Sequence, residues 1–142
     1  LDTKQLTTLI NKKSGLLGLS GVSSDCRDCD AAVEAGNARA RIAMDKLTHD
    51  IIKYIGAYAA QMNGVDLIIF TGGIGENNAV MREQVCKNLE FLGVKFDSQA
   101  NKCRGEERVV STPDSKVKVA VIPTNEELVI ARDTMNIVNG LE

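Results

Sequence analysis

A glycine-rich segment in the middle of the chain has residue types that could bind a phosphorylated ligand. Residues 71–77 read Thr-Gly-Gly-Ile-Gly-Glu-Asn and lie between an apolar run and a helical pattern. Glycine lets a backbone approach a ligand closely, and a helix that starts here offers free N–H groups and the positive end of its dipole. A tight strand-to-helix turn without a ligand explains the same residues, and the local pattern favours neither interpretation.

The glycine pattern differs from two common nucleotide-binding loops. A Walker A loop closes on Gly-Lys followed by Ser or Thr, which is absent from residues 71–78. A dinucleotide fingerprint that starts at Gly73 needs a glycine at position 78, where Asn78 stands. A nicotinamide-dependent dehydrogenase, with Asp97 as its ribose-binding acid, is therefore a weaker alternative.

A segment rich in serine and aspartate, residues 23–28, precedes a helical pattern. Its Arg27 could lay a planar guanidinium on a nucleobase, and Asp25 could accept a hydrogen bond from a ribose or a base amine. Serine and aspartate are also the usual residues that cap helices, and the composition by itself favours that role.

A second polar segment, residues 123–127, reads Pro-Thr-Asn-Glu-Glu and follows a strong strand pattern. Thr124 and Glu127 stand three residues apart at the expected start of a helix, which predicts a capping box. Glu126 is then left as a solvated carboxylate at the helix N-terminus, or as a magnesium ligand beside a phosphate. The local sequence favours the solvated carboxylate.

The first half of the chain is predicted to be helical. A short helix, a glycine-rich turn segment and a long helical region are indicated, over residues 3–13, 13–24 and 28–63. Gly36 and Asn37 can break the long region, and Gly64 has the residue type of its C-cap. Apolar residues at helical spacing predict its buried face: Leu47, Ile51, Ile55, Tyr58 and Met62.

The second half alternates strands with helices. The apolar run at residues 67–70 is typical of a strand buried on both faces, and residues 117–122 form the next strong strand. Strands separated by helices pair in parallel, and ligands gather at the carboxyl ends of such strands. We therefore expect residues 71–77 and 123–127 to meet at one edge of a sheet. Two further helices and two weaker strands are predicted, over residues 79–89, 126–138, 94–96 and 108–110.

The composition is that of an ordinary globular domain. The chain has 142 residues, of which 44% are hydrophobic and 25% charged, enough for one domain with its own core. A formal net charge of −2 gives no support for a nucleic-acid or membrane partner, and no apolar run is long enough to cross a bilayer. The first residues, Leu-Asp-Thr-Lys, do not resemble a signal peptide, and the missing initiating Met indicates a processed chain or an excised piece.

The cysteines give little support for a metal or redox site. Cys26 and Cys29 form a C-x-x-C, a spacing found in zinc and redox sites, but Cys86 and Cys103 form no second such pair. No strand pattern precedes Cys26, as a thioredoxin-like motif would require. We expect four reduced thiols in a cytoplasmic protein.

Taken together, three segments resemble the acetate kinases, in the order in which that family has them. These segments are Asn11 to Arg27 with its terminal Asp-x-Arg, Phe-Thr-Gly-Gly-Ile-Gly-Glu-Asn at 70–77, and Ile-Pro-Thr-Asn-Glu-Glu-Leu at the start of 122–133. The resemblance covers essentially the whole chain. Propionate kinases share much of the pattern and are the closest alternative.

The resemblance implies a fold and a set of site residues. The fold is α/β and ribonuclease-H-like, as in the actin, heat-shock-cognate and sugar-kinase superfamily, with parallel core strands in a mixed sheet flanked by helices. The whole chain, 1–142, would be a single domain, the C-terminal nucleotide-binding lobe of a two-lobe kinase. Glu126 matches the family's magnesium-associated glutamate. The residues expected to line the ATP or ADP site are Asp25, Cys26, Arg27, Gly72, Gly73, Ile74, Gly75, Glu76 and Asn77.

The family transfers a phosphoryl group between ATP and acetate with Mg²⁺, and its members are homodimers. Its N-terminal lobe carries a phosphate loop, arginines, an aspartate and histidines that match nothing in this chain, so no catalytic residue is expected here. Phosphoryl transfer depends on positioning and charge neutralisation of the transferring group, so we expect the chain alone to be inactive. A nucleotide-binding module without catalysis is the alternative from a different functional class.

Overall fold

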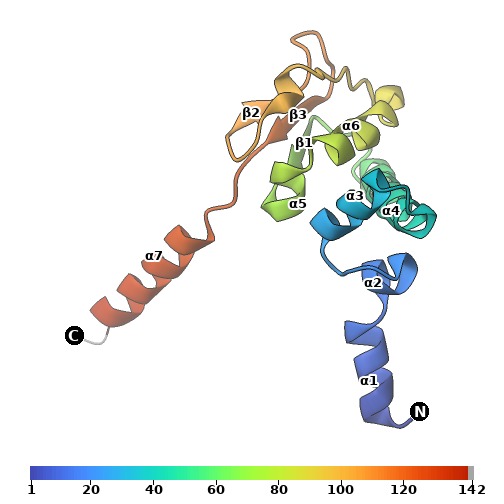
Figure 1. Cartoon of the computed structure of the whole chain (residues 1–142). Helices are drawn as coiled ribbons and strands as arrows, with labels where there is room; N and C mark the ends of the chain where they lie inside the picture. Colours follow the sequence, from blue (N-terminus) through green and yellow to red (C-terminus); the bar gives the residue numbers. More distant parts are fainter. Residues whose placement is uncertain (141–142) are drawn as a thin grey trace. The chain divides into compact units, whose positions relative to one another are not determined.

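A computed structural model describes residues 1–140 (Figure 1). The contacts divide the described chain into two compact units. The helical unit comprises residues 1–65 and 84–91, and the sheet unit comprises residues 66–83 and the described residues from 92 on. The single domain expected from the sequence stays a prediction. None of the helices in the described range is long and apolar enough to span a membrane.

The helical unit begins with two short helices, α1 (Thr3–Lys12) and α2 (Gly15–Ser20). Asp2 and Gln5 form a capping box at the start of α1. Helix α2 lies within the segment that the sequence predicts as turns, so that prediction is wrong for residues 15–20. Its leucines are good helix formers, and Gly21 ends the helix with a left-handed φ of 68°.

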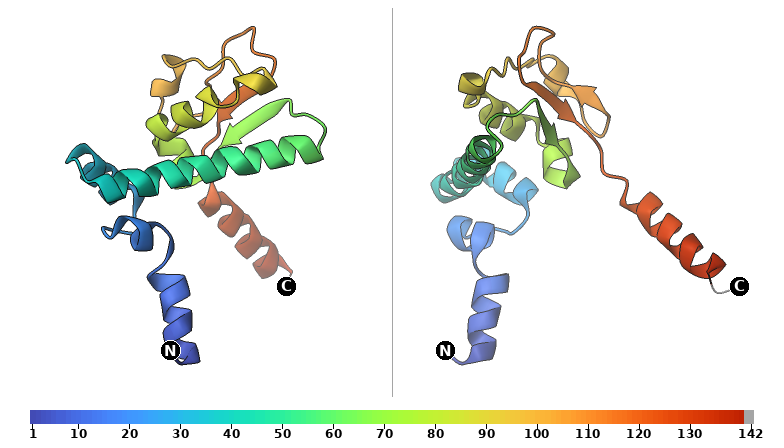
Figure 2. Two further views of the ribbon diagram at one scale, coloured as in Figure 1. Left: turned by 90° about the vertical axis from the view of Figure 1, so that its right-hand side faces the viewer. Right: turned by 180° about the vertical axis from the view of Figure 1, so that it is seen from behind.

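The long helical region is two helices, α3 (Cys26–Glu34) and α4 (Ala38–Gln61). The break falls where the sequence predicts it, because Gly36 has a left-handed φ of 86° and the Asn37 side chain caps α4. Helix α4 runs through the unit without interruption (Figure 2). Met62, rather than Gly64, is its C-cap.

The predicted buried face of α4 is wrong. Tyr58 and Met62 are 61% and 62% exposed, and Leu47, Ile51 and Ile55 are only partly buried. The buried positions of α4 are instead three alanines, at residues 40, 43 and 59. Helices α2 and α3 both pack on α4, and alanine permits the close approach of neighbouring helices. The spacing of apolar residues identified an apolar stripe along α4. It did not identify the positions of α4 on which other helices pack.

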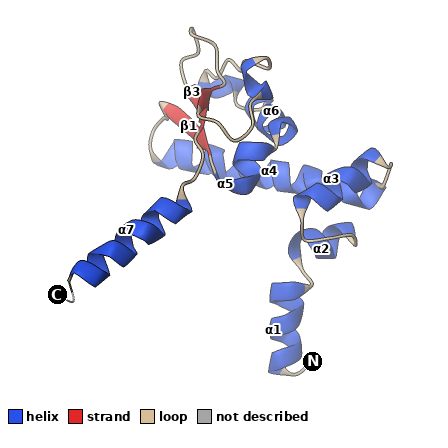
Figure 3. Cartoon of the chain, turned by 60° about the vertical axis from the view of Figure 1, so that its left-hand side comes forward, coloured by secondary structure: helices blue, strands red, loops and turns tan. Residues whose placement is uncertain are grey.

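The sheet unit contains three strands in the order β1-β3-β2, of which β1 and β3 are labelled in Figure 3. Strand β1 (Leu67–Phe70) is parallel to β3 (Lys118–Val121), and β2 (Arg108–Val109) is antiparallel to β3. This mixed sheet with a parallel pair confirms the predicted fold class. Of the weaker predicted strands, residues 94 and 96 form only isolated bridges, to Val117 and Ser111.

Strand β1 is not buried on both faces as predicted. Ile68 and Phe70 are buried, whereas Leu67 and Ile69 are 46% and 47% exposed. The alternation means that one face of β1 packs on the core and the described chain leaves the other uncovered. In β3, which lies within the strand predicted at residues 117–122, Val119, Ala120 and Val121 are all buried.

The helices of the sheet unit follow the two parallel strands. Helices α5 (Gly72–Asn77) and α6 (Ala79–Lys87) follow β1, and α7 (Glu126–Asn139) follows β3. The segment predicted as a tight loop is therefore the short helix α5. Short 3₁₀ turns span Glu90–Leu92 and Ala100–Lys102, and the boundary between the two units falls within α6.

Candidate functional site

The carboxyl ends of β1 and β3 meet through hydrogen bonds, as the sequence predicts. The hydroxyl of Thr124 shares a hydrogen bond of 2.9 Å with the hydroxyl of Thr71. The Gly72 amide donates to the same Thr124 oxygen at 3.0 Å. Residues 71–77 and 123–127 therefore lie at one edge of the sheet, within the sheet unit.

Glu76 makes a third link between these two segments. Its carboxylate accepts a hydrogen bond of 2.7 Å from the backbone amide of Thr124. This bond, more than any other influence, holds the pKa of Glu76 below its ordinary value. The Glu76 side chain is thus engaged in joining α5 to the chain after β3, and the carboxylate is ionised at neutral pH.

The link from Glu76 to Thr124 is expected to depend on pH in the acid range. Because the pKa of Glu76 is lowered in the folded chain, its stabilising effect is fully present above the ordinary value of 4.5 and is lost as the pH falls through the lowered pKa. An NMR titration of the Glu76 carboxyl carbon and the Thr124 amide checks this. Both signals should move together below pH 4.5 in the native chain, and the Thr124 shift should vanish in Glu76→Gln. An ordinary glutamate titration would contradict the expectation.

The three glycines of α5 differ in why glycine is needed. Gly72 has a left-handed φ of 69°, which favours glycine on conformational grounds. A Cβ on Gly75 would lie 3.2 Å from the Phe70 carbonyl carbon, so the close packing of α5 on β1 needs a glycine there. Gly73 has neither reason, since its φ is not positive and a Cβ would meet no atom within 4 Å. The space over Gly73 is open to a ligand.

Two more hydrogen bonds hold the end of α5. The side-chain nitrogen Nδ2 of Asn77 donates to the Gly73 carbonyl at 2.9 Å, and the side-chain oxygen Oδ1 of Asn77 accepts from Nε of Arg104 at 3.1 Å. Ile74 presents an exposed apolar side chain. Of the predicted lining residues in this segment, Glu76 and Asn77 have structural partners, while Gly73 and Ile74 form an open surface.

A buried arginine, Arg82, was not identified from the sequence. Its side chain is fully buried and donates to the carbonyls of Gly75 and Glu76, both at 2.8 Å. It also donates to the side-chain oxygen of Asn101 at 2.8 Å and to the carbonyls of Asn101 and Cys103 at 2.9 and 3.0 Å. Arg82 therefore fastens the end of α5 to the 3₁₀ turn near residue 101.

The sequence does contain a signal for the buried position of Arg82. Cys86 and Leu89 follow it by four and seven residues, and both are buried. Arg82 thus occupies a core position of an apolar helical stripe. A charged residue in such a position must find several acceptors, because an unpaired buried charge is very costly.

The capping box predicted from Thr124 and Glu127 is wrong. Asn125 is the N-cap of α7, and its side chain accepts from the amide of Leu128 at 3.0 Å. The Thr124 hydroxyl is occupied by Thr71 and Gly72, so it does not cap the helix. Glu127 therefore has no place in a cap, and both it and Glu126 are exposed in the first turn of α7.

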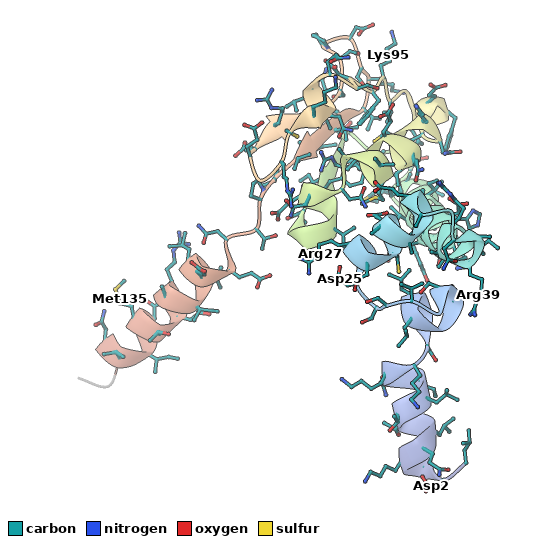
Figure 4. All side chains as sticks on the ribbon, viewed as in Figure 1. Asp2, Asp25, Arg27, Arg39, Lys95 and Met135 are labelled. Carbon is teal, nitrogen blue, oxygen red and sulfur yellow. The ribbon has the colours of Figure 1, made fainter. Side chains whose placement is uncertain are left out.

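The second group of predicted site residues lies in the helical unit. Asp25 is the N-cap of α3 and accepts from the Arg27 amide at 2.8 Å. Their side chains form an ion pair of 2.5 Å, which brings the pKa of Asp25 down to about 2, and the Arg27 side chain is 86% exposed (Figure 4). Cys26 is partly buried, and burial raises the pKa of its thiol. The structure thus shows the capping role of Asp25 and leaves the flat guanidinium of Arg27 accessible.

The carboxylate expected to hold magnesium is a single exposed side chain. In residues 1–140, no three or more His, Cys, Asp or Glu side chains are grouped as a metal site, and all four cysteines are free thiols. Mg²⁺ is commonly bound by one or two carboxylates together with water and substrate phosphates. Glu126, at the sheet edge beside Thr124, has the chemistry to be one such carboxylate.

Comparisons with known proteins agree on one family. The sequence model of the Acetokinase family matches residues 1–132. An acetate kinase from Phocaeicola vulgatus is 58% identical over 139 residues, which cover 98% of this chain and 35% of that protein. The chain thus spans about a third of the length of the curated relatives that it matches.

Solved structures give the same result. The crystal structure of Porphyromonas gingivalis acetate kinase matches with a TM-score of 0.89 and 54% identity, over 97% of this chain and 35% of that one. A propionate kinase from Francisella tularensis matches with a TM-score of 0.81 and 35% identity, over 92% of this chain and 33% of that one.

Proposed function

Because the chain belongs to the acetokinase family, we propose that it is the nucleotide-binding, C-terminal lobe of an acetate kinase. Such a kinase transfers a phosphoryl group between ATP and acetate, with acetyl phosphate and ADP as products. The observation that carries the proposal is the open surface over Gly73, at the sheet edge where α5 begins. Ligands gather at the carboxyl ends of parallel strands, and a glycine with open space above it at that edge lets a ligand approach the backbone.

The residues proposed to contact nucleotide have different parts within the sheet unit and within the helical unit, each taken by itself. The backbone of Gly72, Gly73 and Gly75 provides a surface for the adenosine, and Ile74 adds an apolar side chain beside it. Glu76 and Asn77 contribute mainly by holding α5 in place, through Thr124 and Arg104. In the helical unit, Asp25 fixes the Arg27 guanidinium, whose exposed face can stack on a planar ring.

We assign Glu126 to the magnesium ion of the Mg–ATP substrate, bound directly or through water. When bound, the ion neutralises charge on the phosphates during transfer. Glu126 stands in the first turn of the 14-residue helix α7, where a negatively charged side chain interacts favourably with the helix dipole. Its part is to hold the metal and, with it, the orientation of the phosphates.

Replacement of the two adjacent glutamates is expected to separate their roles. In the full-length kinase, Glu126→Ala should raise the Mg²⁺ requirement and lower kcat about a hundredfold, by analogy with the loss of other charge-stabilising groups. Glu127→Ala should keep kcat within about twofold, because it lies outside the proposed metal site and the helix cap. A magnesium titration of activity, with thermal melting of each variant, is the measurement. Loss of activity in Glu127→Ala alone would show the assignments to be reversed.

The experiment for the proposed function is an assay of acetyl phosphate formation from ATP and acetate. We expect the full-length kinase to be active and the 142-residue chain to show no turnover by itself, since it spans about a third of its relatives. The reason is that transfer needs charge neutralisation around the γ-phosphate. Turnover by the chain at a rate typical of an intact kinase would overturn the second expectation.

Propionate kinase is the second candidate activity, favoured by the similarity to the Francisella tularensis structure. A parallel assay with propionate in place of acetate distinguishes the two activities.

We propose that the kinase is a cytoplasmic homodimer. The exposed apolar residues of α7, such as Leu128, Ile130 and Ile137, support a further protein contact for that helix.

A further inference from the structure

We propose that Thr124 is a positioning residue that links the nucleotide segment α5 to the magnesium carboxylate Glu126. The inference rests on the proposed function, because it assigns a role between two parts of that site. Thr124 is not among the residues that the sequence marks as lining the site. Its three hydrogen bonds, all within the sheet unit, carry the inference.

Thr124 is hydrogen-bonded through both its side chain and its backbone to the segment that follows β1. Its hydroxyl oxygen accepts from the Gly72 amide at 3.0 Å and shares a bond of 2.9 Å with the Thr71 hydroxyl. Its own amide donates to the Glu76 carboxylate at 2.7 Å. A single residue of the segment that follows β3, Thr124, therefore bonds to both the first and the fifth residue of α5.

Thr124 also fixes the position at which α7 begins. Glu126 is the first residue of α7, two positions after Thr124, and every described residue of α7 is exposed. The Asn125 side chain bonds only forward, to the Leu128 amide, so it caps the helix without tying it to the sheet. Among the bonds shown for residues 122–140, those of Thr124 are the last before Glu126 that reach another element.

A bound Mg–nucleotide would require the hydrogen bonds between Thr124 and α5 to hold two parts of the site at a fixed distance. A Mg–nucleotide bound between α5 and Glu126 needs both at fixed positions, and a displacement of about 1 Å can cost about a hundredfold in rate. The hydroxyl of Thr124 sets the distance between the Gly72 amide and the chain that carries Glu126. With a side chain of the same shape but without the hydroxyl, the distance between Gly72 and Glu126 should no longer be fixed. The rest of the sheet should stay intact.

The test compares Thr124→Val with Thr124→Ser in the full-length kinase, with Thr112→Val as the matched control. Valine keeps the shape and removes the hydroxyl, serine keeps the hydroxyl, and Thr112 is a threonine whose hydroxyl bonds only to the exposed Asp114. We expect Thr124→Val to raise the Mg²⁺ concentration for half-maximal activity and to lower kcat, each about tenfold. Serine should restore both values to within about twofold, and the control should match the native kinase.

Three outcomes overturn the inference, and a fourth result separates it from the proposed function. Unchanged magnesium dependence and kcat in Thr124→Val overturn it, as does a serine variant as impaired as the valine variant, which would indicate a methyl contact. If the native kinase forms no acetyl phosphate, the proposed function fails instead. Hydrogen exchange then still tests the link, since Thr124→Val should speed exchange in peptides that cover both Gly72 and the first turn of α7. Unchanged exchange in either peptide overturns it.

Discussion

Replacing Gly73 with valine is expected to weaken ATP binding about a hundredfold while the protein stays folded. A Cβ added at Gly73 would meet no atom within 4 Å and the φ is not positive, so neither the backbone conformation nor the first side-chain carbon opposes the substitution. Valine also has a higher helix propensity than glycine, by a few tenths of a kcal/mol, which favours retention of α5. The added branched side chain would instead occupy the surface proposed for adenosine. The Michaelis constant for ATP and the melting temperature of the full-length kinase measure the two effects.

Two other glycine substitutions serve as controls for this result. Gly56, in α4 of the helical unit, also has no atom within 4 Å of an added Cβ and no positive φ. Gly56→Val therefore makes the same local change outside α5 and should leave ATP binding unaltered. Gly75→Ala should reduce stability instead, because its Cβ would lie 3.2 Å from the Phe70 carbonyl carbon. If folded Gly73→Val bound ATP as tightly as the native kinase, the surface over Gly73 would not be part of the nucleotide site.

Replacing Arg82 with methionine is expected to destabilise the sheet unit by about 3 kcal/mol or more. Methionine keeps much of the volume of the side-chain stem but removes the donors that now satisfy the carbonyls of residues 75, 76, 101 and 103. The carbonyls of the buried residues 75, 101 and 103 would then lose this donor without access to water, which is the costly case. Urea denaturation of the native and variant chains measures the loss.

Arg104→Met is the matched control for Arg82. Arg104 is exposed and donates one Nε hydrogen bond to Asn77, so its loss should cost less than about 1 kcal/mol. If the two variants lost a similar free energy of unfolding, the burial of Arg82 would not explain its contribution to stability, and the prediction would be wrong. Conversely, a destabilised Arg82 variant should also lose ATP affinity, since the end of α5 would no longer be fixed.

The sheet and its edge were predictable because their signals are local. Two apolar runs separated by helical patterns imply parallel strands, and β1 and β3 are parallel neighbours. The C-terminal helix was also predicted to within a residue, since glutamates mark its start and apolar residues continue along it. Such features need only the spacing of residues within one segment.

The contacts that organise the site depend on distant residues and could not be predicted in the same way. Thr124 looks like an N-cap in its own segment, and only its contact with Gly72, more than fifty positions away, gives its hydroxyl another partner. The position of Arg82 in an apolar stripe was visible, but its acceptors near residue 101 were not. The exposure of Tyr58 and Leu67 could not be predicted, because apolar spacing does not reveal what covers a face.

Hydrogen exchange of the full-length kinase with and without Mg–ADP shows whether the nucleotide binds over α5. We expect slower exchange in the presence of Mg–ADP for peptides that cover residues 71–77. We also expect that Gly73→Val abolishes this protection while Gly56→Val retains it. Protection confined to other parts of the kinase, with residues 71–77 unchanged, would contradict binding of the nucleotide over α5.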